Sequence, residues 1–330
     1  MPRTTLVMGG SGFLGSHVVR QLVARGDRVR VWVRPASSSA AFEDLGVEVV
    51  RGELDDQAAL QAAMKGVAAV HYCIVDTRAW LRDPAPLFAT NVEALHGVLD
   101  AVVQVGVPRF VFCSTVGTIG IAERGLADED TPHTWRHLGG PYIDSRIRAE
   151  ELVLQAHRER GLPAVVLNVG TTYGPRDHGP TPHGKLVRAA SRGRMAAFVR
   201  GAAMEVVAIE DAARAFVLAE EHGRIGERYI ISESYLPIEE LFAIAADEGG
   251  VEPPRIGVPL SLMRVIGVLG AAASWLSGRE SVITPTSVRL MHIQSPLDHA
   301  KATRELGWVP GPTEESIRAG VRWFQENRAR

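Results

Sequence analysis

The sequence contains few cysteines and has a net charge close to zero, and each of these features excludes some classes of function. Only Cys73 and Cys113 occur among 330 residues. That is too few for a disulfide framework or a cysteine zinc site, so we expect two buried, reduced thiols and no bound metal. With a net charge of -2, no face is forced to be strongly basic, and we expect neither nucleic acid nor an anionic membrane as a partner. We expect the partners to be small molecules.

The sequence also lacks a long hydrophobic run. Its most apolar later stretch, Val265–Leu276, is shorter than the ~20 apolar residues that cross a bilayer, and Gly267 and Gly270 interrupt it. We therefore predict no membrane span and expect a packed helix or a lid here. A strand-like run begins already at Thr4 or Thr5, which leaves no room for a signal peptide before it, so we expect a cytoplasmic protein.

What the chain does contain is an alternation of strand-like and helical patterns, with 46% hydrophobic residues. Such alternation is typical of strand–helix–strand crossovers and hence of a parallel sheet. We predict an α/β fold, namely a Rossmann-type doubly wound parallel sheet with a smaller C-terminal α/β substrate lobe. The predicted strands are Thr4–Met8, Val29–Val33, Val47–Val50, Ala69–Ile74, Phe110–Cys113 and Ala164–Asn168, and the predicted helices lie around 14–24, 57–64, 87–105 and 142–160.

The alternation weakens after about residue 174, where prolines become frequent. We expect residues 1–174 to form a dinucleotide-binding domain and 175–330 to form mainly the substrate lobe, with segments around 203–222 returning to the first domain. Pro312–Glu315 offers an N-cap and an acidic first turn for a last helix. Ligands of a doubly wound sheet lie beyond the carboxyl ends of its strands, so we expect a single crevice at that edge.

Three glycines lie between the first predicted strand and the first helix. Gly9 can take the tight turn, Gly12 lets the main chain approach phosphate oxygens, and Gly15 lets the helix press against the sheet. The helix N-terminus adds unpaired N–H groups and a positive dipole. The stretch predicts a pocket for the pyrophosphate of a dinucleotide, with the candidate binding residues Gly9, Ser11, Gly12, Phe13, Leu14 and Gly15.

The residue at the end of the second predicted strand indicates whether the site prefers NAD(H) or NADP(H). Folds that select NAD carry an acidic residue there for the ribose hydroxyls, whereas this strand ends in Arg34. The planar guanidinium could pair with a 2′-phosphate, or could stack on adenine without selecting phosphate. We expect NADP(H) in preference to NAD(H), with Glu53 and Leu54 beside the adenine.

The hydroxyl of Thr115 and the phenol of Tyr142 are candidates for binding a substrate oxygen and exchanging a proton with it. Thr115 follows the fifth strand, and Tyr142 opens a long helix with Arg146 on the same face one turn later. We expect the fixed cation to lower the pKa of the phenol from its ordinary value near ~10, so that it exchanges protons with a substrate oxygen near neutral pH. Ser114 competes with Thr115 as the hydroxyl that holds that oxygen, because strand alternation sends the two side chains to opposite faces.

Taken together, these motifs resemble those of the extended short-chain dehydrogenases/reductases of the NAD-dependent epimerase/dehydratase superfamily, over nearly the whole chain. The three glycines match the GxxGxxG of that family, Asn91 matches the start of its NVxG motif, and Tyr173–Arg176 matches its YGPR loop. Residues 76–80, 179–182 and 223–229 are similar to the dihydroflavonol-reductase-like branch, which chiefly contains NADPH-dependent ketone reductases.

The resemblance implies roles for single residues. It makes Thr115 the catalytic hydroxyl, Tyr142 the acid/base, Arg34 the residue that selects the cofactor and Asn91 a support of the active-site backbone. It also implies a homodimer paired through helices 87–105 and 142–160. The family has lysine where this chain has Arg146. Arginine can bind the nicotinamide ribose as that lysine does, but it cannot release its proton at accessible pH.

Three functions are consistent with these residues. The leading one is an NADP(H)-dependent oxidoreductase that interconverts a ketone or aldehyde and an alcohol, with Thr115, Tyr142 and Arg146 as catalytic residues. The alternatives are a sugar-nucleotide 4-epimerase with tightly bound NAD, and a non-catalytic cofactor-binding protein, for which Arg146 is the main support. A 4,6-dehydratase fits less well, because Val116 and Gly117 follow Thr115 where that group carries an acidic pair.

The substrate is expected to be apolar or cyclic. Several apolar residues of the second lobe could line a pocket near the crevice, although a packed core would explain them equally well. They are Leu260, Met263, Ile266, Leu269, Trp275 and Met291.

Overall fold

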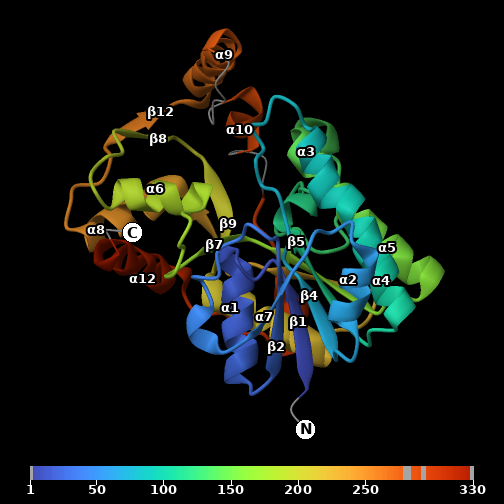
Figure 1. The fold of residues 1–330 in the computed structure, drawn as a ribbon. Coiled ribbons are helices and arrows are strands. Elements are labelled where there is room, and N and C mark those ends of the chain that lie inside the picture. Colours follow the sequence, from blue (N-terminus) through green and yellow to red (C-terminus); the bar gives the residue numbers. More distant parts are fainter. Residues whose placement is uncertain (1–2, 278–283, 291–294, 328–330) are drawn as a thin grey trace.

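Seven parallel strands form the central sheet of the structure, a computed structural model that describes residues 3–277, 284–290 and 295–327. The strand order is β10-β6-β5-β4-β1-β2-β3, so the direction of winding reverses between β1 and β4 (Figure 1). This confirms the predicted doubly wound sheet. The strands are β1 Thr4–Met8, β2 Arg28–Val33, β3 Glu48–Arg51, β4 Ala69–Tyr72, β5 Phe110–Thr115, β6 Ala164–Val169 and β10 Arg228–Ile231.

The two faces of the sheet bury separate apolar layers, because successive strand residues point to opposite sides. Val7 packs with Val18 and Leu22 on one face, whereas its neighbours Leu6 and Met8 belong to the layer on the other. Helices α1, α7 and α11 cover the first face, and α2, α4 and α5 cover the second (Figure 1). Their bounds are α1 Phe13–Ala24, α2 Gln57–Met64, α4 Ala94–Val105, α5 Gly140–Arg160, α7 Ile209–His222 and α11 Ala300–Leu306.

The helix predicted around 87–105 is not a uniform α-helix. It consists of α3 (Ala85–Phe88), a wider π-helical turn η2 (Ala89–Glu93) and then α4. Such widened turns are rare and frequently occur at functional sites. In this chain the widened turn carries Asn91, which is 1% exposed.

A smaller lobe lies beside the carboxyl edge of the sheet (Figure 1). Its three-stranded sheet has the order β11-β9-β7 and packs against α6, α8 and the C-terminal α12. No side chain caps α12, which begins at Thr313 after Pro312, so the expected N-cap is wrong, although Glu314 and Glu315 do lie in the first turn. The lobe consists of β7 Thr171–Tyr173, α6 Pro182–Ala190, β8 Ala197–Val199, β9 Ala203–Ala208, β11 Ser234–Pro237, α8 Ile238–Gly249, β12 Ile256–Val258, α9 Leu260–Ser277, α10 Pro285–Leu290 and α12 Thr313–Glu326.

The apolar stretch from Val265 onward forms helix α9, but the helix is not packed into the protein. Ile266, Leu269 and Trp275 are exposed and so do not belong to a packed core. Leu260 and Met263 are half-buried, and Met291 lies outside the described residues. The expectation of a packed helix is therefore wrong, and the alternative of a lid stays a prediction. Of the helices in the described residues, none combines the length and the hydropathy needed to cross a bilayer.

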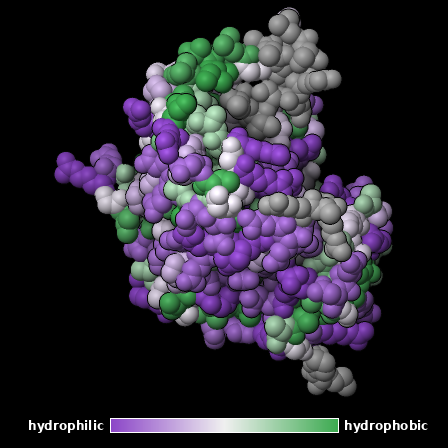
Figure 2. Space-filling view, turned by 90° about the vertical axis from the view of Figure 1, so that its left-hand side faces the viewer, coloured by the Kyte–Doolittle hydropathy of each residue, from purple (hydrophilic) through white to green (hydrophobic). Residues whose placement is uncertain are grey.

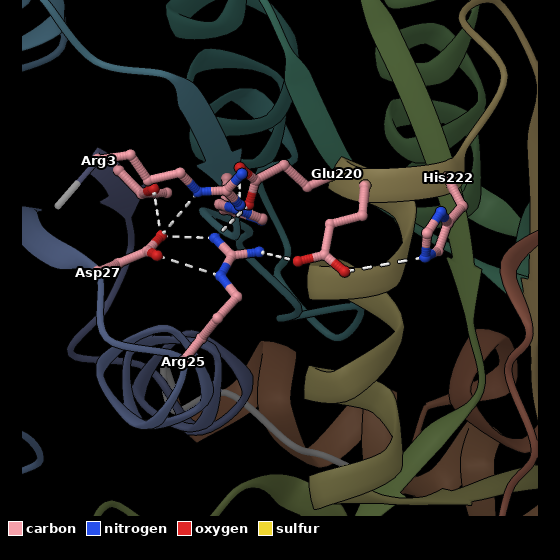
Figure 3. Close-up of polar contacts among 8 residues, drawn as sticks. Arg3, Arg25, Asp27, Glu220 and His222 are labelled. Atoms are coloured by element: carbon pink, nitrogen blue, oxygen red, sulfur yellow. Dashed lines mark hydrogen bonds and ion pairs between the residues drawn. The ribbon is translucent and has the colours of Figure 1, made fainter. Parts of the chain in front are cut away.

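A buried cluster of charges holds the amino ends of β1 and β2, at the opposite end of the sheet from the small lobe. The Arg25 guanidinium lies 2.5 Å from Asp27 and 2.9 Å from Glu220 of α7, and Figure 3 shows it between them. Arg3 reaches Glu220 at 2.6 Å, and His71 of β4 lies 2.9 Å from the same carboxylate. One glutamate thus joins α1, α7 and two neighbouring strands.

Burial opposes the ionisation of Glu220, but hydrogen bonds and positive charge from His71 and Arg25 outweigh it. The pKa of this carboxyl therefore lies below its ordinary value. A carboxylate with a depressed pKa stabilises the fold above its unfolded pKa, and this contribution is lost as the pH falls through the folded pKa.

We predict that Glu220→Gln lowers the free energy of unfolding by about 3 kcal/mol at pH 7, because two arginines lose a buried charged partner. The measurement is urea unfolding, repeated from about pH 5 to about pH 3, over which the gap to the wild type should narrow as Glu220 protonates.

Glu221→Gln is the matched control. Glu221 also pairs with Arg25 but is 33% exposed, so its loss should cost less than about 1 kcal/mol. Equal effects of the two substitutions would show that the buried cluster contributes no special stability.

Candidate active site

The loop between β1 and α1 presents main-chain groups at the carboxyl edge of the sheet. Gly9 has φ +85°, and a Cβ on it would lie 2.9 Å from the main-chain carbon of Cys73, so only glycine fits this turn. A Cβ on Gly15 would overlap the carbonyl oxygen of Gly9. Gly12 precedes α1 in an extended conformation with no side-chain cap, which leaves the first N–H groups of the helix available. The loop can therefore take an anion such as pyrophosphate.

The other loop residues predicted to bind the dinucleotide lie at the same turn. Ser11 is exposed, and Phe13 and Leu14 are half-buried. One turn into α1, His17 bonds the carbonyl oxygen of Pro175 at 3.1 Å. Burial lowers the pKa of His17 to about 4, so the ring is neutral and joins this helix to the loop after β7.

Arg34 lies exposed directly after β2. Burial raises the pKa of the Asp76 carboxyl, but the hydrogen bonds and charge of Arg78, and after them the positive charge of Arg34, lower it below its ordinary value. The loop of Arg34 is fixed from behind by Arg51 at the end of β3, which donates to the carbonyl oxygens of Pro35 (3.1 Å) and Ser37 (2.9 Å). Sequence reasoning missed Arg51. The sequence could have indicated it, because Arg51 ends the strand that follows β2 in the chain, just as Arg34 follows the end of β2. In the structure Arg51 is in register with Val33.

After β3, Glu53 is exposed and Leu54 is half-buried. Both therefore flank the loop that follows Arg34 at the carboxyl edge, because β2 and β3 are parallel neighbours. This arrangement is compatible with contacts to an adenine.

The structure separates the two candidate hydroxyls at the end of β5. Ser114 is buried and donates to Glu150 of α5, which also accepts from Thr118 and Asn168, each at 2.8 Å. The hydroxyl of Ser114 is thus used inside the protein. Thr115 is half-buried, and its hydroxyl accepts only from the amide of Gly117, at 3.2 Å, among the described residues. It remains free to donate to a ligand.

Arg146 is a buried cation without a carboxylate partner among the described residues. Its exposed fraction is 1%. One terminal nitrogen donates to the carbonyl oxygen of Cys113 at 2.5 Å, and its guanidinium carbon lies 5.5 Å from the centre of the Phe112 ring. The Nε–H is buried and has no partner. An unsatisfied buried donor is costly, so this N–H indicates a place for a ligand acceptor.

Tyr142 lies one turn before Arg146 on α5 and packs with Ile143 and Trp135. Burial raises the pKa of its phenol above the ordinary value, while Arg146 opposes this rise only in part. The expectation of a lowered pKa is therefore wrong, because desolvation outweighs the neighbouring charge. The phenol is a protonated O–H at neutral pH, which suits a proton donor.

Asn91 joins the segments on either side of this site. Its amide donates to the carbonyl oxygen of Asp76 and to the hydroxyl of Ser145, each at 3.0 Å, and its oxygen accepts from the amide of Asp76 at 2.8 Å. It therefore fixes the loop after β4 against helix α5.

The geometry brings the end of β5 and the start of α5 to one place. Arg146 bonds the carbonyl oxygen of Cys113, two residues before Thr115, and its charge acts on the phenol of Tyr142. The glycine loop follows β1, which is parallel to β5 with β4 between them, so the loop opens at the same edge of the sheet. The arrangement offers an anion-binding loop, an acid and a fixed cation.

The sequence pattern of the NAD dependent epimerase/dehydratase family matches residues 5–232, which is more than half of the chain. The chain belongs to this family. It is 31% identical to sterol demethylase protein B of Methylococcus capsulatus, over 98% of both chains. It is 28% identical to a putative dihydroflavonol 4-reductase of Synechocystis, over 97% of this chain and 94% of the relative.

Solved structures agree with this assignment. The crystal structure of gox2253 has a TM-score of 0.87 and 33% identity, with 99% of both chains covered. A double mutant of dTDP-glucose 4,6-dehydratase from Streptomyces venezuelae, with NAD bound, has a TM-score of 0.79 and 26% identity over 98% of this chain and 97% of that one. The predicted resemblance to extended short-chain dehydrogenases/reductases is thus confirmed.

We predict that the two hydroxyls of β5 differ in their effect on stability. Ser114→Ala should lower the free energy of unfolding by about 1–3 kcal/mol, because the buried Glu150 loses a donor, whereas Thr115→Val should cost less than about 1 kcal/mol. Urea unfolding of both variants gives the comparison. A larger loss for Thr115→Val would mean that its hydroxyl, too, is used in the fold.

Proposed function

We propose that this family member is an NADP(H)-dependent reductase that interconverts a ketone or aldehyde and an alcohol. The observation that carries the proposal is the buried guanidinium of Arg146, which has no carboxylate partner among the described residues and retains an unsatisfied Nε–H beside Tyr142. A cation buried in this way favours a site built for a ligand with acceptor oxygens.

The residues present fit a nicotinamide dinucleotide. Gly9, Gly12 and the start of α1 would hold the pyrophosphate, and Arg34 would hold a 2′-phosphate. The unsatisfied Nε–H of Arg146 would bind hydroxyls of the nicotinamide ribose, while Asn91 keeps the neighbouring backbone in place. When bound in its reduced form, the cofactor would supply the hydride to the carbonyl carbon.

The protein's own part is to place and protonate the carbonyl oxygen. Tyr142, protonated because burial raises its pKa, would donate its proton to that oxygen as hydride arrives at the carbon. Thr115 would donate a second hydrogen bond to the same oxygen. Arg146 cannot pass protons, so Tyr142 would regain its proton directly from solvent. A protonated phenol favours the reducing direction.

The relatives support one class of substrate. Proteins named for sterol and flavonoid substrates are 31% and 28% identical over nearly the whole chain, which supports an apolar, cyclic ketone. We assign its binding mainly to residues 175–330. A homodimer through α4 and α5, and a cytoplasmic location, stay predictions.

Arg34→Ala should weaken NADPH binding at least about tenfold more than NADH binding, because only NADPH carries the phosphate that the guanidinium would pair with. Affinities come from quenching of tryptophan fluorescence. Arg28→Ala, an exposed arginine at the other end of β2, is the control and should change neither affinity. Equal losses for the two cofactors at Arg34 would overturn the assignment of phosphate binding.

Tyr142→Phe should lower kcat for ketone reduction by roughly 100-fold to 10,000-fold with little change in NADPH affinity. Because the pKa of Tyr142 is raised, wild-type reduction should be flat with respect to this group between about pH 6 and pH 9, and should fall only above about pH 10. The measurement is NADPH oxidation with a panel of cyclic ketones.

Two results would contradict the reductase proposal. The first is a tightly held NAD with conversion of a sugar nucleotide and no net redox change, which would show an epimerase. The second is NADPH binding without reduction of any carbonyl, together with activity that appears in Arg146→Lys, which would show a binding protein that has lost its chemistry.

A further inference from the structure

Helix α9 exposes more large apolar side chains than any other segment of the described residues. Six of them are between 36% and 71% exposed, and Figure 2 shows apolar side chains gathered at the top of the molecule, where Figure 1 places α9. They are Leu262, Val265, Ile266, Val268, Leu269 and Trp275. Patches of this kind mark interaction sites.

The exposed side chains form a ridge and not a flat face. At about 100° per residue they spread over roughly half of the circumference of the helix. The opposite side carries Gly267, which packs closely on Thr284 and Pro285 at the start of α10. The helix stands away from the body of the protein (Figure 1).

The charge of this region differs from that of the whole chain. Helix α9 contains no acidic residue, and its one charged residue, Arg264, is exposed and forms no ion pair with any described residue. Of the neighbouring arginines, Arg255 pairs with Glu252 at 2.7 Å and Arg289 donates to the carbonyl oxygen of Leu138. Arg264 is therefore the charge that α9 itself presents to the outside, and it is positive.

The helix next to α9 contacts the candidate catalytic helix. In α10, Thr286 packs against Gly140, and Arg289 donates to the carbonyl oxygen of Leu138 at 3.4 Å. Leu290 packs in the same cluster as Tyr142. The exposed ridge is therefore one helix away from the proposed proton donor.

We propose that α9 docks the protein onto the surface of a lipid bilayer that carries anionic headgroups. The ridge would enter the boundary between headgroups and acyl chains, with Arg264 at its margin facing lipid phosphates. The inference rests on the proposed function for one point, namely that the apolar substrate would pass from the membrane to Tyr142.

A second copy of the chain fits this ridge less well than a bilayer does. A stable protein interface buries about 800 Å² on each partner over a complementary surface, whereas a single protruding helix is convex and narrow. Pairing two copies through α9 would also bring each Arg264 to a helix that offers no acidic partner. A bilayer with anionic headgroups accepts a convex apolar ridge and attracts Arg264.

The test is co-sedimentation of the full chain with sucrose-loaded vesicles of equal parts phosphatidylcholine and phosphatidylglycerol. The wild type should sediment with these vesicles and less with pure phosphatidylcholine. The double variant Val265→Gln and Val268→Gln should reduce the bound fraction about tenfold. Leu126→Gln with Val309→Gln, which changes two equally exposed apolar residues elsewhere, is the matched control and should bind like the wild type.

A second measurement reports the depth of α9. Brominated phosphatidylglycerol should quench part of the tryptophan fluorescence of the wild type, and Trp275→Phe should abolish that quenching. Trp275 is 71% exposed, so its replacement should leave the fold intact. Undiminished quenching in Trp275→Phe would place the contact with lipid elsewhere and overturn the proposal.

Other outcomes also decide the matter. If the wild type stays in solution with both vesicles, or if the control pair loses binding equally, α9 is not a membrane contact. If the α9 variant instead dissociates a dimer in light scattering, the ridge is an interface between copies. Vesicle binding needs no turnover, so failure to reduce any ketone would reject the proposed activity and leave the docking result standing.

Discussion

The candidate active site depends on one buried guanidinium. Arg146 is almost fully removed from solvent, and the partners it has are a carbonyl oxygen of β5 and the face of Phe112. A charge that has lost its hydration is stable only where the surrounding dipoles and acceptors are fixed. The hydrogen bond from Arg146 therefore fixes the start of α5 against the end of β5. This keeps Tyr142 at the carboxyl edge of the sheet, where the glycine loop also lies.

Burial raises the pKa of Tyr142 and the charge of Arg146 lowers it, and burial has the larger effect. A phenol that keeps its proton at neutral pH can give it to an oxygen that gains negative charge. Arg146 then contributes in another way than by lowering the pKa of the phenol. It can bind hydroxyls and stabilise developing negative charge without exchanging its own proton. The replacement of lysine by arginine thus fits a site in which solvent, and not a relay through the cation, restores the tyrosine.

Two buried polar clusters hold opposite edges of the central sheet. At the carboxyl edge, Glu150 accepts from Ser114, Thr118 and Asn168 and is 2.9 Å from Arg228, which joins α5 to β5, β6 and β10. At the amino edge, Glu220 has the corresponding role for α1, α7, β1 and β4. Both carboxylates are bonded to donors of the protein, although His71 Nδ1 and Asn168 Oδ1 have no partner among the described residues. At the site itself, the hydroxyl of the half-buried Thr115 and the Nε–H of Arg146 remain available to a ligand.

The sequence by itself determined the sheet, most helix positions and the glycine loop. Strand and helix periodicity and the steric needs of Gly9 and Gly15 are local properties, readable over a few residues. Only the tertiary structure decided that Ser114 is used internally while Thr115 is not, that Arg51 fixes the loop of Arg34, and that α9 lies exposed. Those facts depend on which distant segments meet and how much water they exclude. The raised pKa of Tyr142 has the same origin. The sequence shows Arg146 one turn away, but it does not show that the phenol is buried.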